Sequence, residues 1–361
     1  MEKESTNDVP QLITIQLNPD NRETPINFID RGYVKTFQFF RRNHFDYPKI
    51  GEENFYLTVL GLQEHGGKKA IVGYKLLQKM ESCTVEMVLE CAGNRRIKFT
   101  ESASGVQWGN GAISYGKWKG VTLNKLLAAV VDLRSDLSKC EVLFTGHDFG
   151  KEISNSDTYN YQRSLPLEKA LDDQTIVAYA YNDKPLTREH GHPLRLIVPG
   201  WYGMASVKWL KSIEIINKKF TGEFQKQYVY AVRNGNFQSQ SVTTINVNSL
   251  IQMPLHQSNH AVGESIEIRG IAYSGEGLIS KVEISLDNQK SYSEVTLLGE
   301  PNGKYSWRYW VYEFVPVAPG SYTICVRACD TEGRIQPSAP LANIANYGYN
   351  AISKITINIK N

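Results

Sequence analysis

One thiol followed at once by two fixed positive charges is the most unusual chemical grouping in this sequence. In MVLECAGNRRIKF (87–99), an apolar, strand-like run ends at Cys91, a glycine and an asparagine break the strand, and Arg95 and Arg96 follow. Most lone cysteines are buried core residues. Neighbouring cations, however, favour the thiolate, the form that binds metals or acts as a nucleophile. No Cys-His-Asn protease signature surrounds Cys91, so we predict that it is a metal or cofactor ligand.

Three further segments place polar side chains at loop positions. They are FFRRNHF (39–45), FTGHD, which ends in Asp148, and REHGHPLRLIVPGWYGMASVKWL (188–210). Taken alone, the first two segments are better explained as ordinary surface turns, and the third is explained equally well as a strand and loop with scattered surface charges. Together their arginines, lysine and histidines can hold an anionic group through charge-assisted hydrogen bonds and exposed backbone N–H groups. Two histidines of the third segment are two residues apart, which does not match a helical zinc pair. The set favours a large anionic cofactor with a soft-ligand metal over hydrolysis.

The elements that must position these residues mix strands with short helices in the first part of the chain. β-Branched and apolar runs predict strands, and apolar residues at helical spacing predict helices. The expected strands are 54–62, 84–92, 140–146, 175–182 and 193–200, and the expected helices are 122–133, with Thr122 as N-cap, and 165–173, opened by Pro166. Strands interleaved with short helices indicate a mixed α/β domain.

From residue 242 onward the helical signal disappears. Alternating strands are expected at 265–275, 279–287, 305–315, 320–330 and 354–361. Several short alternating strands separated by glycine and proline turns are typical of an immunoglobulin-like sandwich. The fold class is therefore α+β, with a mixed α/β domain over residues 1–235 and an all-β sandwich over residues 236–361.

Composition limits the remaining possibilities. The chain has 361 residues, a formal net charge of +3 and an isoelectric point of about 8.4. This weak positive charge, without long lysine or arginine runs, argues against nucleic acid as a partner. No stretch of about 18 apolar residues predicts a membrane-spanning helix. The polar N-terminus has no apolar signal-peptide core, so the expected location is the cytoplasm, or an exported compartment if a leader has been removed.

An ordered set of motifs resembles the sulfite oxidase family of molybdopterin-dependent oxidoreductases. CAGNRR (91–96) resembles that family's molybdenum-ligand motif, and FFRRNH (39–44) is similar to its Phe-Phe-x-Arg-Asn-His segment. Further similar segments are WGNGAISYGKWKGVTLNKLL (108–127), YQRSLPLEKALD (161–172), and HGHPLRLIVPG followed by SVKWL (190–210). The sandwich domain resembles the family's dimerisation domain more loosely, and ends in NYGYNAISKI.

The resemblance implies a role for each matching residue. Cys91 is implied as the molybdenum ligand, through a sulfur whose softness suits that metal. The pterin and its phosphate are implied to be held by Phe40, Arg42, Asn43, His44, Asp148, His190, Arg195, Ser206, Val207 and Lys208. The substrate pocket is implied to contain Arg42, Arg96, Trp108 and Tyr228. The implied chemistry is oxygen-atom transfer to or from a small oxyanion, most simply the oxidation of sulfite to sulfate. Because no haem or flavin domain is expected, electrons would pass to a separate carrier such as a cytochrome, and the protein would be a homodimer.

Two departures from the family pattern concern positive charge. Sulfite-oxidising members carry a pocket arginine where this chain has Ala345, and another family arginine is replaced here by Ala205. Each charge-assisted bond to a buried anion is worth roughly 1.5–3 kcal/mol, so doubly charged sulfite would bind more weakly unless Arg41 or a lysine compensates. Plant-type nitrate reductases also lack the first of these arginines. A reductase of nitrate or of an S- or N-oxide, and a cofactor-free binding protein of the same fold, therefore remain the alternatives.

Overall fold

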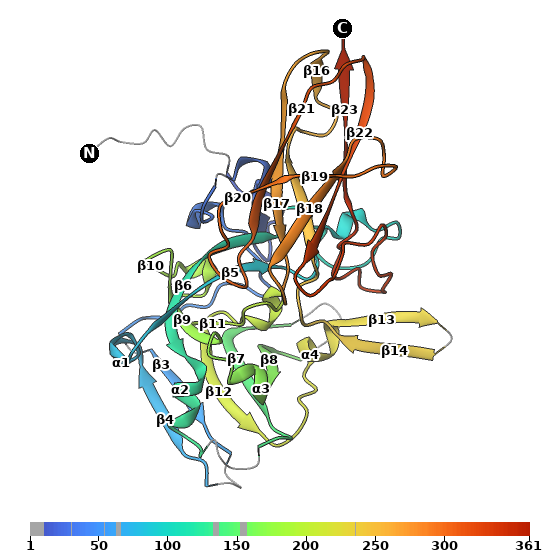
Figure 1. Cartoon of the computed structure of the whole chain (residues 1–361). Helices are drawn as coiled ribbons and strands as arrows, with labels where there is room; N and C mark the ends of the chain where they lie inside the picture. Colours follow the sequence, from blue (N-terminus) through green and yellow to red (C-terminus); the bar gives the residue numbers. More distant parts are fainter. Residues whose placement is uncertain are drawn as a thin grey trace, which may run out of the picture.

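The computed structural model describes residues 11–29, 31–53, 55–62, 66–132, 137–151, 157–234 and 236–361 (Figure 1). Most of the N-terminal segment on which the expected location rests, residues 1–10, lies outside the described residues. The same holds for the first residue of the strand expected at 54–62 and the last residue of the helix expected at 122–133.

Two five-stranded sheets build the first domain. The first has the order β10-β9-β6-β5 with β11 also paired to β9, and consists of β5 (Cys83–Glu90), β6 (Ile113–Thr122), β9 (Ile176–Tyr181), β10 (Lys184–Pro185) and β11 (Arg195–Ile197). The second has the order β4-β3-β12-β7-β8, and consists of β3 (Tyr56–Leu60), β4 (Lys69–Gly73), β7 (Glu141–Gly150), β8 (Tyr159–Pro166) and β12 (Leu210–Ile216). All six residues of β9 are buried, as expected for a strand covered on both faces.

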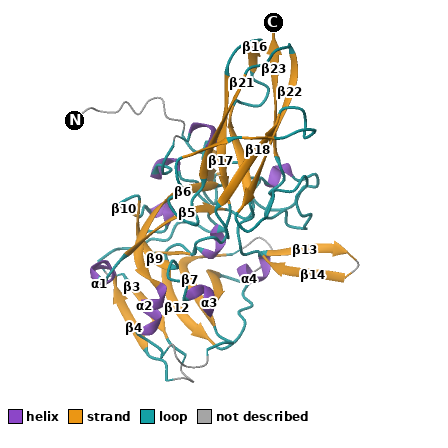
Figure 2. Cartoon of the chain, viewed as in Figure 1, coloured by secondary structure: helices purple, strands orange, loops and turns teal. Residues whose placement is uncertain are grey.

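The helices are short, and strands dominate the fold (Figure 2). They are α1 (Tyr74–Lys79), α2 (Leu123–Ala128), α3 (Leu167–Ala170) and α4 (Glu223–Gln227). The expected position of α2 after Thr122 is confirmed, although the threonine side chain makes no capping hydrogen bond. The helix ends earlier than predicted because Val130 turns its carbonyl to the amide of Lys68, at 2.6 Å. The prediction over 165–173 was also too long, because β8 continues through Pro166 and only four residues are helical.

Two small antiparallel ribbons complete the first part of the chain. They are β1 (Ile13–Gln16) with β2 (Asn21–Glu23), and β13 (Val229–Asn234) with β14 (Asn236–Ser241). The expected domain boundary between residues 235 and 236 falls between β13 and β14, and it stays a prediction. The second ribbon projects from the side of the molecule (Figure 1).

The C-terminal domain consists of two packed sheets, which confirms the predicted all-β character. One sheet has the order β15-β17-β21-β20, and consists of β15 (Asn248–Met253), β17 (Ile266–Tyr273), β20 (Thr296–Leu298) and β21 (Arg308–Phe314). The other has the order β16-β23-β22-β18-β19, and consists of β16 (Asn259–Ala261), β18 (Ile279–Ser285), β19 (Ser293–Glu294), β22 (Gly320–Asp330) and β23 (Ser353–Lys360). Alternate residues such as Ile268, Val282 and Ile324 fill the core between the sheets.

The two domains meet where β5 ends. The hydroxyl of Tyr273 in β17 donates to the Glu90 carboxylate at 2.7 Å, and the amide of Gly348 donates to the carbonyl of Ala92 at 2.8 Å. The segment after β5 is therefore held by both domains. Among the described residues, no helix has the length and apolar character needed to cross a membrane.

Candidate functional site

Cys91 lies directly after the last residue of a buried strand. Its amide still donates to the carbonyl of Ala112 at 2.9 Å, which continues the pairing of β5 with β6 for one more residue. The chain then turns, because the amide of Asn94 donates back to the carbonyl of Cys91 at 2.8 Å. The turn leaves the thiol half-buried at the edge of a cavity.

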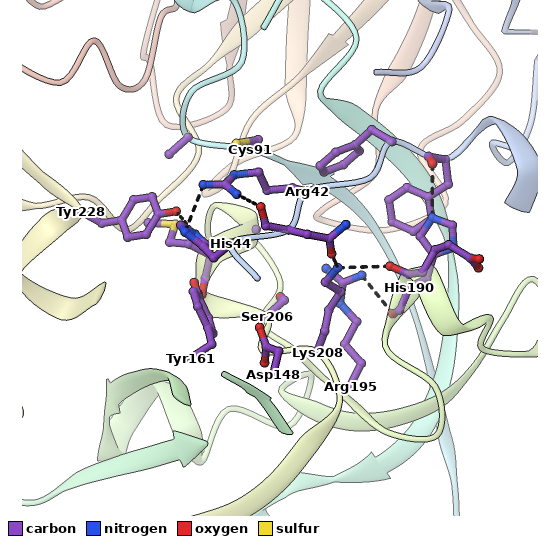
Figure 3. Close-up of a pocket in the computed structure, with 17 residues that line it drawn as sticks. Arg42, His44, Cys91, Asp148, Tyr161, His190, Arg195, Ser206, Lys208 and Tyr228 are labelled. Carbon is purple, nitrogen blue, oxygen red and sulfur yellow. Dashed lines mark hydrogen bonds between the residues drawn. The ribbon is translucent and has the colours of Figure 1, made fainter. Parts of the chain in front are cut away.

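Most of the predicted site residues line this cavity (Figure 3). The structure brings together Phe40, Arg42, Asn43, His44, Cys91, Asp148, His190, Arg195, Ser206, Lys208 and Tyr228. They come from segments far apart in the sequence: the loop after residue 38, the turn after β5, β7, β11 with the loops on either side of it, and the residue that follows α4. These residues therefore form one continuous site rather than several separate turns.

Three predicted site residues do not line the cavity. Trp108 is completely buried, with its ring centroid 6.5 Å from that of Phe40. Val207 is buried, and its carbonyl accepts from the amide of Leu196 at 2.8 Å, so it anchors the loop that carries Ser206 and Lys208. The third residue, Arg96, points toward the C-terminal domain.

The orientation of Arg96 follows from the backbone at Arg95. Arg95 has a φ of +64°, a left-handed conformation that redirects the chain before the next side chain. Arg96 then donates from Nε to the carbonyl of Ala345 at 3.2 Å and from Nη1 to the carbonyl of Val106 at 2.9 Å. Its guanidinium lies 5.1 Å from the ring centroid of Tyr347. Arg96 thus joins the two domains at Ala345, the position where the family resemblance implies an arginine in sulfite-oxidising members.

One end of the cavity gathers buried basic side chains. Burial, with the charge of Arg195 next, lowers the pKa of Lys208 well below its ordinary value. Lys208 donates to the side-chain oxygen of Asn43 and, at 3.1 Å, to the carbonyl of Glu189. Arg195 donates to the carbonyl of His190 at 3.3 Å. Burial lowers the pKa of Arg195 to about 9, which leaves it charged at neutral pH, and burial together with Arg195 lowers the pKa of His190 to about 3. The histidine is therefore neutral and the arginine positive.

Asp148 is the carboxylate at this end. Burial raises its pKa to about 7, although the charge of Lys208 opposes the rise. Its Oδ1 atom is buried without a hydrogen-bond partner, as is Nε of Arg195. Unpaired buried polar atoms are costly, so both indicate a place where a polar ligand belongs.

Sequence reasoning missed several cavity residues, of which Tyr161 is the most informative. It lies on β8 with its hydroxyl donating to the carbonyl of Met204 at 2.8 Å, and Met204 itself lines the cavity. Two residues along β8, Arg163 is buried behind the wall and lies 5.4 Å from the ring centroid of Tyr228. Tyr161 and Arg163 are two residues apart on a strand, so their side chains share a face, and the period of the strand could have grouped them.

The donor set fits the cofactor that the resemblance implies. A half-buried thiol can supply a soft metal ligand, while the basic side chains and the unpaired Nε donor of Arg195 at the other end suit a phosphate. Among the described residues, no group of three or more histidine, cysteine or carboxylate side chains could hold a metal ion alone. The site therefore suits a metal whose other ligands come from a cofactor.

Comparisons with known proteins assign each of the two parts of the chain to a described family. Residues 44–224 match the family described as "Oxidoreductase molybdopterin binding domain", and residues 239–360 match "Mo-co oxidoreductase dimerisation domain". The crystal structure of the sulfane dehydrogenase SoxCD from Paracoccus pantotrophus has a similar fold, with a TM-score of 0.82 over 100% of this chain and 96% of that one, at 22% identity.

Curated relatives include oxidases and reductases. Mitochondrial sulfite oxidase of Mus musculus is 30% identical over 97% of this chain, which spans 66% of that protein's length. Sulfite oxidase of Arabidopsis thaliana is 28% identical over 91% of this chain and 88% of its own length. An inducible NADH nitrate reductase of Glycine max is 29% identical over 95% of this chain and 41% of its own length.

Proposed function

Because this chain belongs to the sulfite oxidase family of molybdopterin oxidoreductases, we propose that it oxidises sulfite to sulfate. The observation that carries the proposal is the position of Cys91, a single thiol at the edge of a cavity that also contains the cations of Arg42, Arg195 and Lys208. Four relatives named as sulfite oxidases in mammals align along nearly the whole chain, which supports this substrate.

The bound cofactor would supply molybdenum, which accepts two electrons as an oxygen atom is transferred. Cys91 is proposed as its protein ligand. The residues proposed to hold the pterin and its phosphate are Phe40, Arg42, Asn43, His44, Asp148, His190, Arg195, Ser206, Val207 and Lys208. Val207 would act through its backbone, since its side chain is packed in the core.

The chain's own residues would bind and neutralise the anion. Arg42 and Tyr228 line the cavity near Cys91 and would hold the sulfite oxygens through hydrogen bonds (Figure 3). Sulfite and water give sulfate, two protons and two electrons. The electrons would pass to an external carrier of the cytochrome type, and the protons to solvent. Arg96 and Trp108 would support the pocket wall rather than contact the anion.

Nitrate reduction is the second candidate, and Ala345 favours it. With alanine at this position, only the backbone carbonyl is directed toward Arg96. A pocket with one cation fewer suits an anion of single charge better than one of double charge. The nitrate reductase relative aligns over nearly the same part of the chain.

Metal analysis of purified protein is the first test. About one molybdenum per chain is expected from a host that makes the cofactor, and its absence would overturn both enzyme functions. Cys91→Ala should abolish turnover while preserving the fold. Cys83→Ala is the matched control, because Cys83 begins the strand that Cys91 follows and lies outside the cavity lining. Full activity of Cys91→Ala would refute the ligand role.

Two assays separate the substrates. Reduction of ferricyanide that depends on sulfite supports the oxidase, whereas oxidation of a reduced viologen that depends on nitrate supports the reductase. Activity in the second assay alone would reject sulfite oxidation.

The C-terminal domain is proposed to form a homodimer, as the description of its family suggests. Light scattering should give twice the mass of the chain. A monomer at micromolar concentration would contradict the proposal.

A further inference from the structure

His44 lies between an arginine and a tyrosine that both face the cavity. Its Nδ1 atom is 3.2 Å from Nη2 of Arg42, and its Nε2 atom is 2.9 Å from the hydroxyl of Tyr228 (Figure 3). The ring is fixed by two aromatic neighbours, with centroid distances of 4.4 Å to Phe224 and 5.2 Å to Tyr161. The side chains of Arg42, His44 and Tyr228 are therefore connected by consecutive hydrogen bonds along the cavity wall.

The arginine determines which atom donates and which accepts in this series of hydrogen bonds. A guanidinium has only donors, so Nδ1 of His44 must accept the bond from Arg42. Neutral imidazole carries one proton, which is then on Nε2. Burial, with the charge of Arg42 next, keeps the pKa of His44 well below its ordinary value, so the ring does not gain a second proton near neutral pH. His44 must consequently donate to the oxygen of Tyr228.

The orientation of the tyrosine proton follows from that of the histidine. Since the hydroxyl oxygen accepts from His44, the O–H of Tyr228 remains available for a bond of its own. Tyr228 is 4% exposed and lines the cavity. Burial raises its pKa well above the ordinary value, so it keeps its proton. A group bound in the cavity beside Tyr228 can therefore accept a hydrogen bond from the tyrosine O–H.

Because both ring nitrogens of His44 are engaged, by Arg42 and by Tyr228, its side chain has no polar atom left to bind the pterin directly. We propose that His44 is instead a positioning residue which, held in the Nε2–H form by Arg42, makes Tyr228 a hydrogen-bond donor to the bound substrate. The substrate class is an anion with an unprotonated oxygen directed at Tyr228. This rests on the proposed function, because it concerns the substrate of that site. The tautomer of His44 can nevertheless be measured without any turnover.

The first test is nuclear magnetic resonance of the holoprotein labelled with ¹⁵N-histidine. The signal of His44 is assigned by its disappearance in His44→Gln. Long-range proton–nitrogen correlations are expected to show a protonated Nε2 and an unprotonated Nδ1. A proton on Nδ1, or protons on both nitrogens, at pH 7 would overturn the proposal. If His44 shows the expected tautomer but the wild-type protein does not oxidise sulfite, the proposed function fails and the proposal about the tautomer does not.

The second test compares two amide substitutions by kcat/KM for sulfite per bound molybdenum. Glutamine places its NH₂ group where Nε2 lies, whereas asparagine is too short to reach the tyrosine. His44→Asn is expected to lose about tenfold more than His44→Gln, since a hydrogen bond to a charged ligand depends on it. Tyr228→Phe should lower kcat/KM for sulfite at least about tenfold when it is made in the wild type, and should lower it little when it is made in His44→Asn.

Equal losses in the two amide variants, or the same cost of Tyr228→Phe in both backgrounds, would refute the coupling. The affinity for sulfate, measured by calorimetry, should follow the same order and requires no turnover. If the asparagine variant takes up no molybdenum, the tautomer measurement on the wild type decides.

Discussion

Glu90, the residue before Cys91, should make the stability of the protein fall as pH rises. Its carboxylate is buried between the domains, where Oε1 accepts from Asn94 at 2.9 Å and from Tyr273 at 2.7 Å. Oε2 is buried without a hydrogen-bond partner. Burial raises the pKa of Glu90 from 4.5 to about 7, although the two hydrogen bonds oppose the rise. The folded protein therefore holds this proton more tightly than the unfolded chain does.

The sign and size of the effect follow from linkage. Between about pH 4.5 and 7 the folded state binds more protons, so the free energy of unfolding decreases as pH increases. The difference between the two pKa values, at about 1.4 kcal/mol per pH unit, gives a loss of about 3 kcal/mol above pH 7. Glu90→Gln should remove this loss, because the amide keeps both accepted bonds at its oxygen and resembles the protonated acid.

Urea unfolding at pH 5 and pH 8.5, followed by tryptophan fluorescence, tests the reasoning. We expect Glu90→Gln to exceed the wild type by less than about 1 kcal/mol at pH 5 and by about 3 kcal/mol at pH 8.5. Tyr273→Phe, which removes one bond that favours the ionised form, should lose more stability at pH 8.5 than at pH 5. An advantage of Glu90→Gln that is the same at both pH values would refute the reasoning.

Two other substitutions test the packing around the site. Arg95→Met should lower the free energy of unfolding by about 3 kcal/mol, because the buried guanidinium donates to Asn248 of the C-terminal domain at 2.9 Å. If the urea unfolding curve of the variant matches that of the wild type, Arg95 does not stabilise the contact between the domains. Gly116→Ala should cost at least about 1–3 kcal/mol, since its Cβ would lie 2.2 Å from the ring of Tyr181. Gly51→Ala, where nothing lies within 4 Å, is the control in thermal unfolding and should match the wild type.

Local pattern predicted much of the fold. The strands of the sandwich were identified because alternation has the same period as the pleat, and burial follows it over residues 266–270 of β17 and 326–330 of β22. The helix at 122–133 was predicted too long because its valines continue the apolar pattern. The carbonyl of Val130 instead accepts from the amide of Lys68, a contact that no local pattern in the helix reveals.

The candidate site was predictable as a set of residues but not as a geometry. Motifs in order along the chain identified the cavity residues, since each lies at a loop or strand end. The direction of Arg96 could not be predicted, because it depends on the left-handed backbone at Arg95 and on Ala345, which is 249 residues away. The role of Arg163 was hidden for the same reason: only the folded chain brings β8 next to Tyr228.

The structure also limits which residues could replace the two arginines that the family resemblance implies at the positions of Ala345 and Ala205. Arg41 cannot compensate, because it forms an ion pair with Asp20 at 3.1 Å and does not line the cavity. Lys208 lies among the cations at the far end of the cavity from Cys91, which suits a phosphate (Figure 3). Near the thiol, Arg42 is the cation on the described cavity wall, with Arg163 buried behind Tyr228. We infer that the hydroxyl of Tyr228 and the charge behind its ring together supply part of what a third arginine would provide. A substrate held in this way would depend on a directed hydrogen bond more than on direct contact with several charges, and its affinity should respond less to salt than to the loss of that hydroxyl.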